Sequence, residues 1–186
     1  MKYVLLIPLM RLWPNWTSRG GTVRNSLFST LSALVVAGLL VPVPATAECY
    51  DPPGAYVIWA KCDFTRKNLE GANLKRAVLE DAVLRYTKLK GANLEKADLR
   101  GADVSNADMS GANLKNAKLM KAIIKDTNLS GADLTGANLE GANLERANLT
   151  GAKMDGTKLG AVRMSGATWT DGKTKCKGGS VGRCIK

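Results

Sequence analysis

The motif that decides the fold reads Gly91-Ala92-Asn93-Leu94-Glu95-Lys96-Ala97-Asp98-Leu99 in the middle of the chain. This five-residue unit, Ala-(Asn/Asp)-Leu-x-x, repeats from Cys62 to Asp171 for 22 consecutive units without an insertion. The central position is Leu in 15 units and another apolar residue in the rest, and Ala stands two positions earlier in 16 units. Such regularity indicates a chain built by stacking one short structural unit.

A five-residue period excludes the two common regular structures. An α-helix turns about 100° per residue, so the Leu residues would spread around the whole cylinder. In a continuous strand successive side chains alternate, so every second Leu would lie on the opposite face. The pattern is satisfied if each unit is a short extended piece, with Ala and Leu both facing inward, followed by a corner.

The last position of the unit supplies that corner, because it is Gly in ten units and Gly tolerates left-handed turn conformations. One glycine column recurs every twenty residues: Gly71, Gly91, Gly111, Gly131 and Gly151. A fifteen-residue spacing gives no comparable column. The sequence therefore predicts four units, one per side, in each coil.

With these tandem units the chain resembles the pentapeptide-repeat family over about 110 residues. The resemblance implies an all-β fold, a right-handed quadrilateral β-helix. With strands about 4.8 Å apart, 22 units at four per coil give about five and a half coils and a rod roughly 26 Å long. Lys67 at an Ala position predicts an irregular first coil, and Val162 with Trp169 predicts an atypical last coil. Because the ends of a solenoid need covering, we expect caps at residues 48–61 and 172–186 on either side of the array at 62–171.

Residues 1–47 have the pattern of a secretory signal peptide. Four basic and no acidic residues precede the apolar run Leu27 to Val43, and Ala45-Thr46-Ala47 offers a cleavage site. We expect the mature chain to start at Glu48, to be exported to the periplasm, or alternatively to the thylakoid lumen, and to have no stable membrane insertion. An uncleaved anchor, and Met10 rather than Met1 as the start, are the alternatives.

Positive charge gathers at the C-terminus. The formal net charge is +11 for the whole chain and +7 without residues 1–47, and residues 172–186 alone carry +5. Summed over the repeat units, the four expected sides carry about +1, 0, +2 and 0 in chain order. No expected side is acidic.

The residue types that catalysis usually needs are scarce. The chain has no histidine, which removes the commonest general bases, nucleophile partners and metal ligands. Asp98, Asp103 and Asp108 should lie on three different sides, where they cannot converge as an acid/base pair. We expect no catalytic, cofactor or metal site.

The four cysteines, Cys49, Cys62, Cys176 and Cys184, lie before, at the very start of, or after the array. Their spacings do not match a zinc site, and an even number in an exported chain indicates disulfides. Four cysteines allow three pairings. A rod of five coils would hold the two ends beyond disulfide reach, which leaves Cys49 with Cys62 and Cys176 with Cys184.

A candidate contact strip consists of apolar residues in outward positions: Val78, Val83, Tyr86, Met120 and Ile123. Exposed apolar strips mark contact surfaces. The alternative is scattered surface residues, or residues shielded by the N-terminal segment.

Two classes of function follow from the resemblance. The first is an exported structural or protein-interaction scaffold with an unidentified protein partner, present as a monomer or associating end to end. The second is a DNA mimic that binds gyrase, as in quinolone-resistance members of the family, and both export and the lack of an acidic side argue against it. Nucleic acid is not an expected partner.

Overall fold

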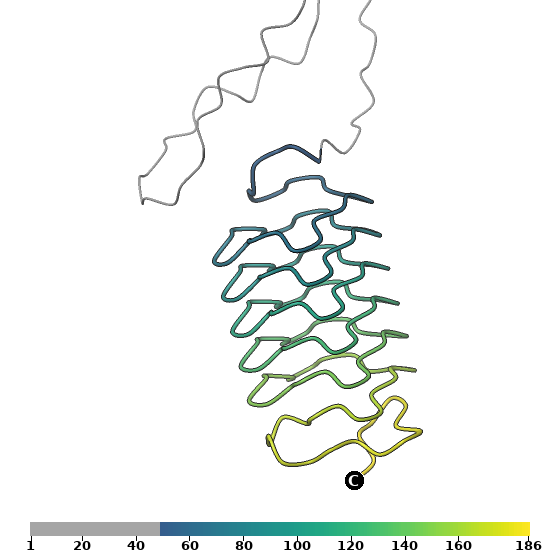
Figure 1. Ribbon diagram of the computed structural model, residues 1–186. Coiled ribbons are helices and arrows are strands. Elements are labelled where there is room, and N and C mark those ends of the chain that lie inside the picture. Colours follow the sequence, from purple (N-terminus) through teal and green to yellow (C-terminus); the bar gives the residue numbers. More distant parts are fainter. Residues whose placement is uncertain (1–48) are drawn as a thin grey trace, which may run out of the picture. The chain divides into compact units, whose positions relative to one another are not determined.

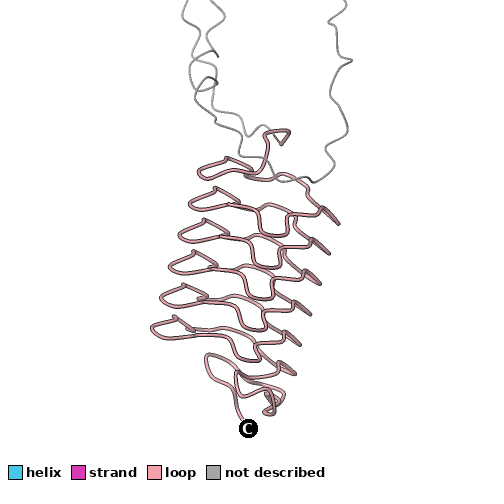
Figure 2. Cartoon of the chain, turned by 90° about the vertical axis from the view of Figure 1, so that its left-hand side faces the viewer, coloured by secondary structure: helices cyan, strands magenta, loops and turns pink. Residues whose placement is uncertain are grey.

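The computed structural model describes residues 49–186, which lie within one unit of the chain, Ala45–Lys186 (Figure 1). The predicted signal peptide at residues 1–47 and the predicted start at Glu48 fall outside the described residues. The described chain winds as a stack of coils without any helix (Figure 2).

Successive coils are joined by isolated parallel β-bridges between residues twenty apart, from Ile58↔Val78 to Asn148↔Thr168. Twenty residues are four units of five, so each coil has four sides, as the glycine column predicted. No strand in residues 49–186 is longer than one bridge, because each extended piece ends at a corner. We number the sides in chain order from Cys62, so that Leu84 lies on side 1, Leu89 on side 2, Leu94 on side 3 and Leu99 on side 4.

The units before the last coil share one hydrogen-bonding scheme, which can be followed on side 3. The backbone N–H groups of Leu94 and Lys96 donate to the following coil, at Asn113 O (2.7 Å) and Lys115 O (2.8 Å). The N–H of Asn113 donates back to Ala92 O (2.9 Å). Each side therefore sends two donors toward the C-terminal end of the stack and one toward the N-terminal end.

Every corner between Tyr56 and Gly166 places its fifth residue at positive φ. Glycine adopts this conformation without cost, but Lys121 (59°) and Arg146 (58°) adopt it as well. A non-glycine residue there costs roughly 1–2 kcal/mol. The corner is thus imposed by the packing of the coil and not by glycine alone.

The interior is a column of central side chains separated by the Ala rungs, and both are almost completely buried. Thr87 and Thr127 occupy Ala positions and are also buried. Their hydroxyls donate to Phe64 O (3.0 Å) and Val104 O (2.8 Å), so neither hydroxyl is left unpaired in the core.

The ladder begins one unit earlier than the boundary at Cys62 that the sequence suggested. Val57 to Lys61 already follow the unit, with Ile58 bridged to Val78 and Trp59 buried in the central position. Trp59 packs against Phe64 with ring centroids 4.2 Å apart. The backbone of the first coil is regular at Lys67, whose N–H makes the usual bond to Phe64 O (3.0 Å). The Lys67 side chain is exposed where the later coils of this side have a buried Ala or Thr, so the expected irregularity is limited to the side chain.

The C-terminal tail turns back across the last coil. Val181 pairs with Arg163 and Lys175 with Thr168, and both bridges are antiparallel. Backbone donors of the last coil, such as Met164 N and Gly166 N, find acceptors in the tail at Ser180 O (3.0 Å) and Cys176 O (2.7 Å). The tail therefore covers sides 1 and 2.

Candidate interaction surfaces

Two disulfides hold the ends of the described chain. They join Cys49 to Cys62 (Cα–Cα 5.5 Å) and Cys176 to Cys184 (Cα–Cα 4.9 Å), which is the pairing expected from the sequence. No cysteine in residues 49–186 is free. Each bond closes a short loop at one end of the stack, so neither links the two ends.

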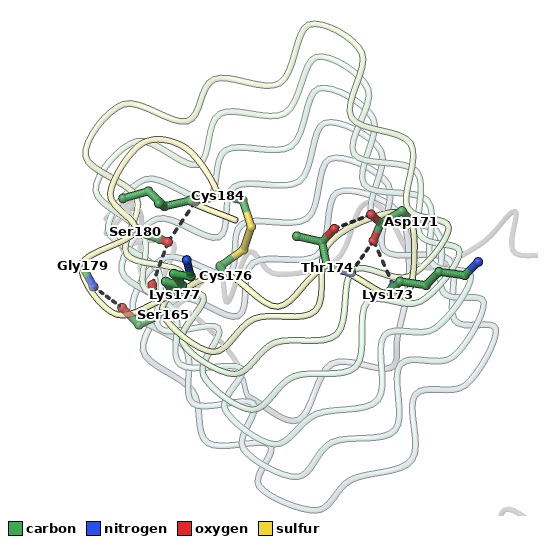
Figure 3. Close-up of a disulfide and its surroundings, with 10 residues drawn as sticks. Ser165, Asp171, Lys173, Thr174, Cys176, Lys177, Gly179, Ser180 and Cys184 are labelled. Atoms are coloured by element: carbon green, nitrogen blue, oxygen red, sulfur yellow. Dashed lines mark hydrogen bonds between the residues drawn. A yellow bond between two sulfur atoms is a disulfide. The ribbon is translucent and has the colours of Figure 1, made fainter.

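The C-terminal disulfide closes a loop that is ordered by a buried serine (Figure 3). The Ser180 hydroxyl donates to Lys177 O (2.8 Å) and accepts a bond from Ile185 N (3.1 Å). Gly179 N donates to the Ser165 hydroxyl of the last coil (3.2 Å). These bonds fix the loop against the solenoid.

A carboxylate organises the turn that leads into the tail. Asp171 accepts bonds from Lys173 N (2.9 Å), Thr174 N (2.7 Å) and the Thr174 hydroxyl. The hydrogen bond from the Thr174 side chain, followed by the two backbone bonds, lowers the pKa of Asp171 to about 2. Asp171 is therefore ionised throughout the neutral range.

The outward Asn and Asp side chains have a structural role. Asn113 Oδ1 accepts the N–H of Lys115 two residues on (3.2 Å), and its amide donates to Asn93 Oδ1 in the preceding coil (3.2 Å). Asn93 in turn donates to Asn73 Oδ1 (3.3 Å). The second position of the unit thus closes a local turn and builds a ladder of amides along side 3.

The carboxylates are distributed as the spacing predicted. Asp98, Asp103 and Asp108 lie in three different bridge columns, on sides 4, 1 and 2. The pKa of Asp126 is lowered mainly by the hydrogen bonds that Arg146 donates to its carboxylate. The pKa of Asp133 is lowered in the same way, mainly by hydrogen bonds from Thr135. A general acid near neutral pH needs a raised pKa, so neither group is suited to proton donation. Within residues 49–186, no group of three or more potential metal ligands is found.

The five residues of the candidate contact strip do not form one continuous surface. Val83 and Ile123 lie on side 1, but Asp103 is bridged between them and pairs with Arg85 (3.5 Å). Tyr86 (48% exposed) and Ile123 (40%) are open to solvent, whereas Val78, Val83 and Met120 are half-buried. The structure therefore separates the residues of the first coils from Met120 and Ile123.

Two exposed side chains that the sequence analysis assigned to a cap join Val78 and Tyr86 in the first coils. Ile58 (40% exposed) is bridged to Val78, and Tyr56 (61%) lies at a corner with Arg76 5.6 Å from its ring centroid. Arg66 lies over Tyr86 in the same way, at 5.5 Å. Extending the five-residue register one unit upstream would have placed Ile58 in an outward position. We call Tyr56, Ile58, Val78, Val83 and Tyr86 the N-terminal apolar patch. They lie on sides 4 and 1 and at the outer corners of these two sides, with the charged corner of Lys61 and Asp81 between the sides.

Comparison with known proteins identifies the repeat. The family model for pentapeptide repeats (8 copies) matches residues 62–101, 87–126, 97–136 and 127–166. This chain belongs to the pentapeptide-repeat family. The observed coil of four five-residue units is therefore the quadrilateral β-helix of that family. No curated protein sequence matches the chain at a significant level.

Solved structures of other members resemble this one. Rfr23 from Cyanothece 51142 is 27% identical with a TM-score of 0.50, over 60% of this chain and 90% of Rfr23. HetL from Nostoc sp. PCC 7120, involved in heterocyst differentiation regulation, is 36% identical with a TM-score of 0.48, over 64% of this chain and 58% of HetL. A thylakoid-lumen protein from Arabidopsis thaliana is 32% identical with a TM-score of 0.43, over 49% of this chain and 67% of that one. This chain thus spans less than two thirds of HetL.

Proposed function

We propose that the chain is an exported scaffold that binds another protein and has no catalytic activity. The observation that carries the proposal is the N-terminal apolar patch, where Tyr56, Ile58 and Tyr86 are exposed on a solenoid whose other outward positions are mostly polar. Exposed apolar clusters with aromatic and arginine side chains are typical of protein interfaces. The regular ladder beneath the patch holds these side chains at fixed spacing.

The disulfides bear on the compartment. Disulfides persist in oxidising environments, and both described pairs lie in short terminal loops. We propose the periplasm as the site of function, with the thylakoid lumen as the alternative. In residues 49–186 there is no helix long and apolar enough to cross a membrane.

The gyrase-binding alternative has less support. The solved structures also include QnrB1, a plasmid-mediated fluoroquinolone resistance protein that is 24% identical with a TM-score of 0.51, and this likeness concerns the fold alone. A DNA mimic needs a continuous acidic surface, whereas the repeat units of sides 1 and 3 carry a net positive charge and those of sides 2 and 4 are neutral. We expect no inhibition of gyrase supercoiling at concentrations that saturate the protein partner.

The test is cross-linking of the purified protein in an extract of its own compartment, followed by mass spectrometry. We compare the wild type with the double variant Ile58→Asp/Tyr86→Asp and with Asn143→Asp, a matched change at an outward position of a distant coil. The proposal expects one protein to be cross-linked by the wild type and by Asn143→Asp but lost from the patch variant. Equal capture by all three proteins would contradict it.

A further inference from the structure

The last coil has an open edge on two of its four sides. The tail covers sides 1 and 2, but the backbone N–H groups of Met154, Gly156, Leu159 and Ala161 have no acceptor among residues 49–186. The equivalent groups of the coils before it donate to the next coil, as Leu134 N does to Lys153 O (2.8 Å). Sides 3 and 4 therefore present four aligned donors at the C-terminal end of the stack.

The side chains beside these donors are incompletely covered. Met154 and Leu159 are half-buried, whereas Leu134 and Leu139, one coil earlier, are fully buried. The difference arises because no further coil stacks on the last coil at these two sides within residues 49–186; of the tail, Gly182 lies beside Leu159 and Ala161 but provides no acceptor for their N–H groups. An unpaired edge next to partly exposed apolar side chains is a template for an added strand.

The C-terminal end of the chain, which includes this edge, is strongly positive. From Gly151 onward the chain has two acidic residues, Asp155 and Asp171, and eight basic ones: Lys153, Lys158, Arg163, Lys173, Lys175, Lys177, Arg183 and Lys186. None of the eight forms an ion pair within residues 49–186, although nine ion pairs link charged residues between Lys75 and Arg146. Unpaired donors and uncompensated positive charge both favour a partner rich in acceptors and negative charge.

A second copy of this chain does not fit these requirements. In a head-to-tail stack that keeps the register, the first coil would place Pro53 over Lys153 and Ile58 over Lys158, and neither is acidic. The tail also lies over sides 1 and 2, where the next coil would continue. Two C-terminal ends facing each other would bring like charges together.

We propose that sides 3 and 4 of the last coil bind an extended acidic segment of another protein, which adds to the stack with carboxylates facing Lys153 and Lys158. The molecule contains a precedent for this contact, since Asp98 and Lys118 are bridged in adjacent coils and their side chains pair at 3.6 Å. The inference rests on the proposed protein-binding function and assigns a partner class to a second surface, at the opposite end of the solenoid from the N-terminal apolar patch.

The probe is a synthetic peptide of two repeat units, Ala-Asp-Leu-Ser-Gly-Ala-Asp-Leu-Ser-Gly, titrated into the full chain with its disulfides intact. Nitrogen-15 NMR should show shifts at the amides of Met154, Gly156, Leu159 and Ala161 that weaken with salt. A peptide with Lys in place of both Asp residues should bind roughly tenfold more weakly, because two attractive pairs become repulsive. The variant Lys153→Glu/Lys158→Glu should reverse the preference, and Lys88→Glu, a change at the same ladder position far from the edge, should not.

Several outcomes would overturn the inference. The first two are equal affinity for the Asp and Lys peptides and NMR shifts that are largest at other residues. The third is dimerisation through the open edge in sedimentation experiments. The fourth is that phosphatidylglycerol vesicles, but not the peptide, shift the NMR signals of the four amides. The capture experiment on the N-terminal apolar patch does not involve these residues, so failure of one proposal is distinguished from failure of the other.

Discussion

At the scale of the residue, the inward and outward positions of the unit differ in what they tolerate. Leu114 is fully buried among other central side chains, whereas Asn113, next to it in sequence, makes a turn bond to Lys115 N and an amide contact with Asn93. The inward position is shielded from water, so it requires an apolar side chain. The outward position is defined by hydrogen bonds that water can replace.

Leu114→Asp should therefore unfold or split the solenoid, because it places an unpaired charge in the core at a cost of several kcal/mol. Asn113→Ser loses only replaceable hydrogen bonds and should cost about 1 kcal/mol. Thermal and urea unfolding followed by circular dichroism compares the two variants. Equal stability would mean that the Leu column does not face inward.

Two corner glycines should respond differently to alanine. Both Gly131 (φ 67°) and Gly101 (φ 68°) are left-handed, so each substitution should cost roughly 1 kcal/mol from the backbone alone. A Cβ at Gly131 meets nothing within 4 Å, whereas a Cβ at Gly101 collides with Asp81 Oδ1. Gly101→Ala should thus be the more destabilising, and adding Asp81→Ala should remove the difference in unfolding free energy. If Asp81→Ala left that difference unchanged, the contact would not be its cause.

At the scale of the element, the turn from Asp171 to Thr174 begins the tail that covers sides 1 and 2. Trp169 N donates to Thr174 O (2.8 Å) across this turn, and the bridge between Thr168 and Lys175 follows directly. The carboxylate of Asp171 is thus the organising group of the C-terminal cap.

The pKa of Asp171 predicts an acid-sensitive cap. Because its pKa falls from 3.8 to about 2 on folding, its contribution to stability is complete above pH 4 and is lost as the pH falls toward 2. NMR titration of the carboxyl carbon should give a midpoint near 2 in the wild type and a value closer to 3.8 in Thr174→Ala. A midpoint that Thr174→Ala leaves unchanged would show that the hydrogen bonds do not cause the shift.

At the scale of the whole described unit, coils contact only their neighbours, so the ends and the centre should unfold separately. Each disulfide closes a short loop and should contribute on the order of 2–3 kcal/mol. Reduction should fray residues 49–61 and 172–186, while the central coils persist, and release of the tail from sides 1 and 2 should allow an end-to-end association that the intact protein does not show. Hydrogen exchange measured by mass spectrometry, with sedimentation for association, provides the check, and uniform loss of protection along the chain would contradict it.

The sequence predicted the coil better than its ends, for a physical reason. A solenoid repeats one environment, so the same buried position occurs many times in the sequence, at Leu94 and its equivalents. The glycine column at the corners predicted the number of sides. The ends have no such repetition. Val57-Ile58-Trp59 was not assigned to the ladder because it lacks the usual Ala, Asn and Leu, and no pattern in Gly172 to Lys186 revealed an antiparallel return over only two sides.

Because bridged residues are twenty apart, the number of residues between two positions determines both their separation along the stack and the sides on which they lie. Insertion of twenty residues would add one coil, move the two disulfide-closed ends about 4.8 Å further apart, and leave their relative orientation almost unchanged. Insertion of five residues would instead turn the C-terminal end by a quarter of a coil relative to the N-terminal apolar patch. Duplication of units can therefore set the distance and the direction between two binding surfaces independently, without altering either surface.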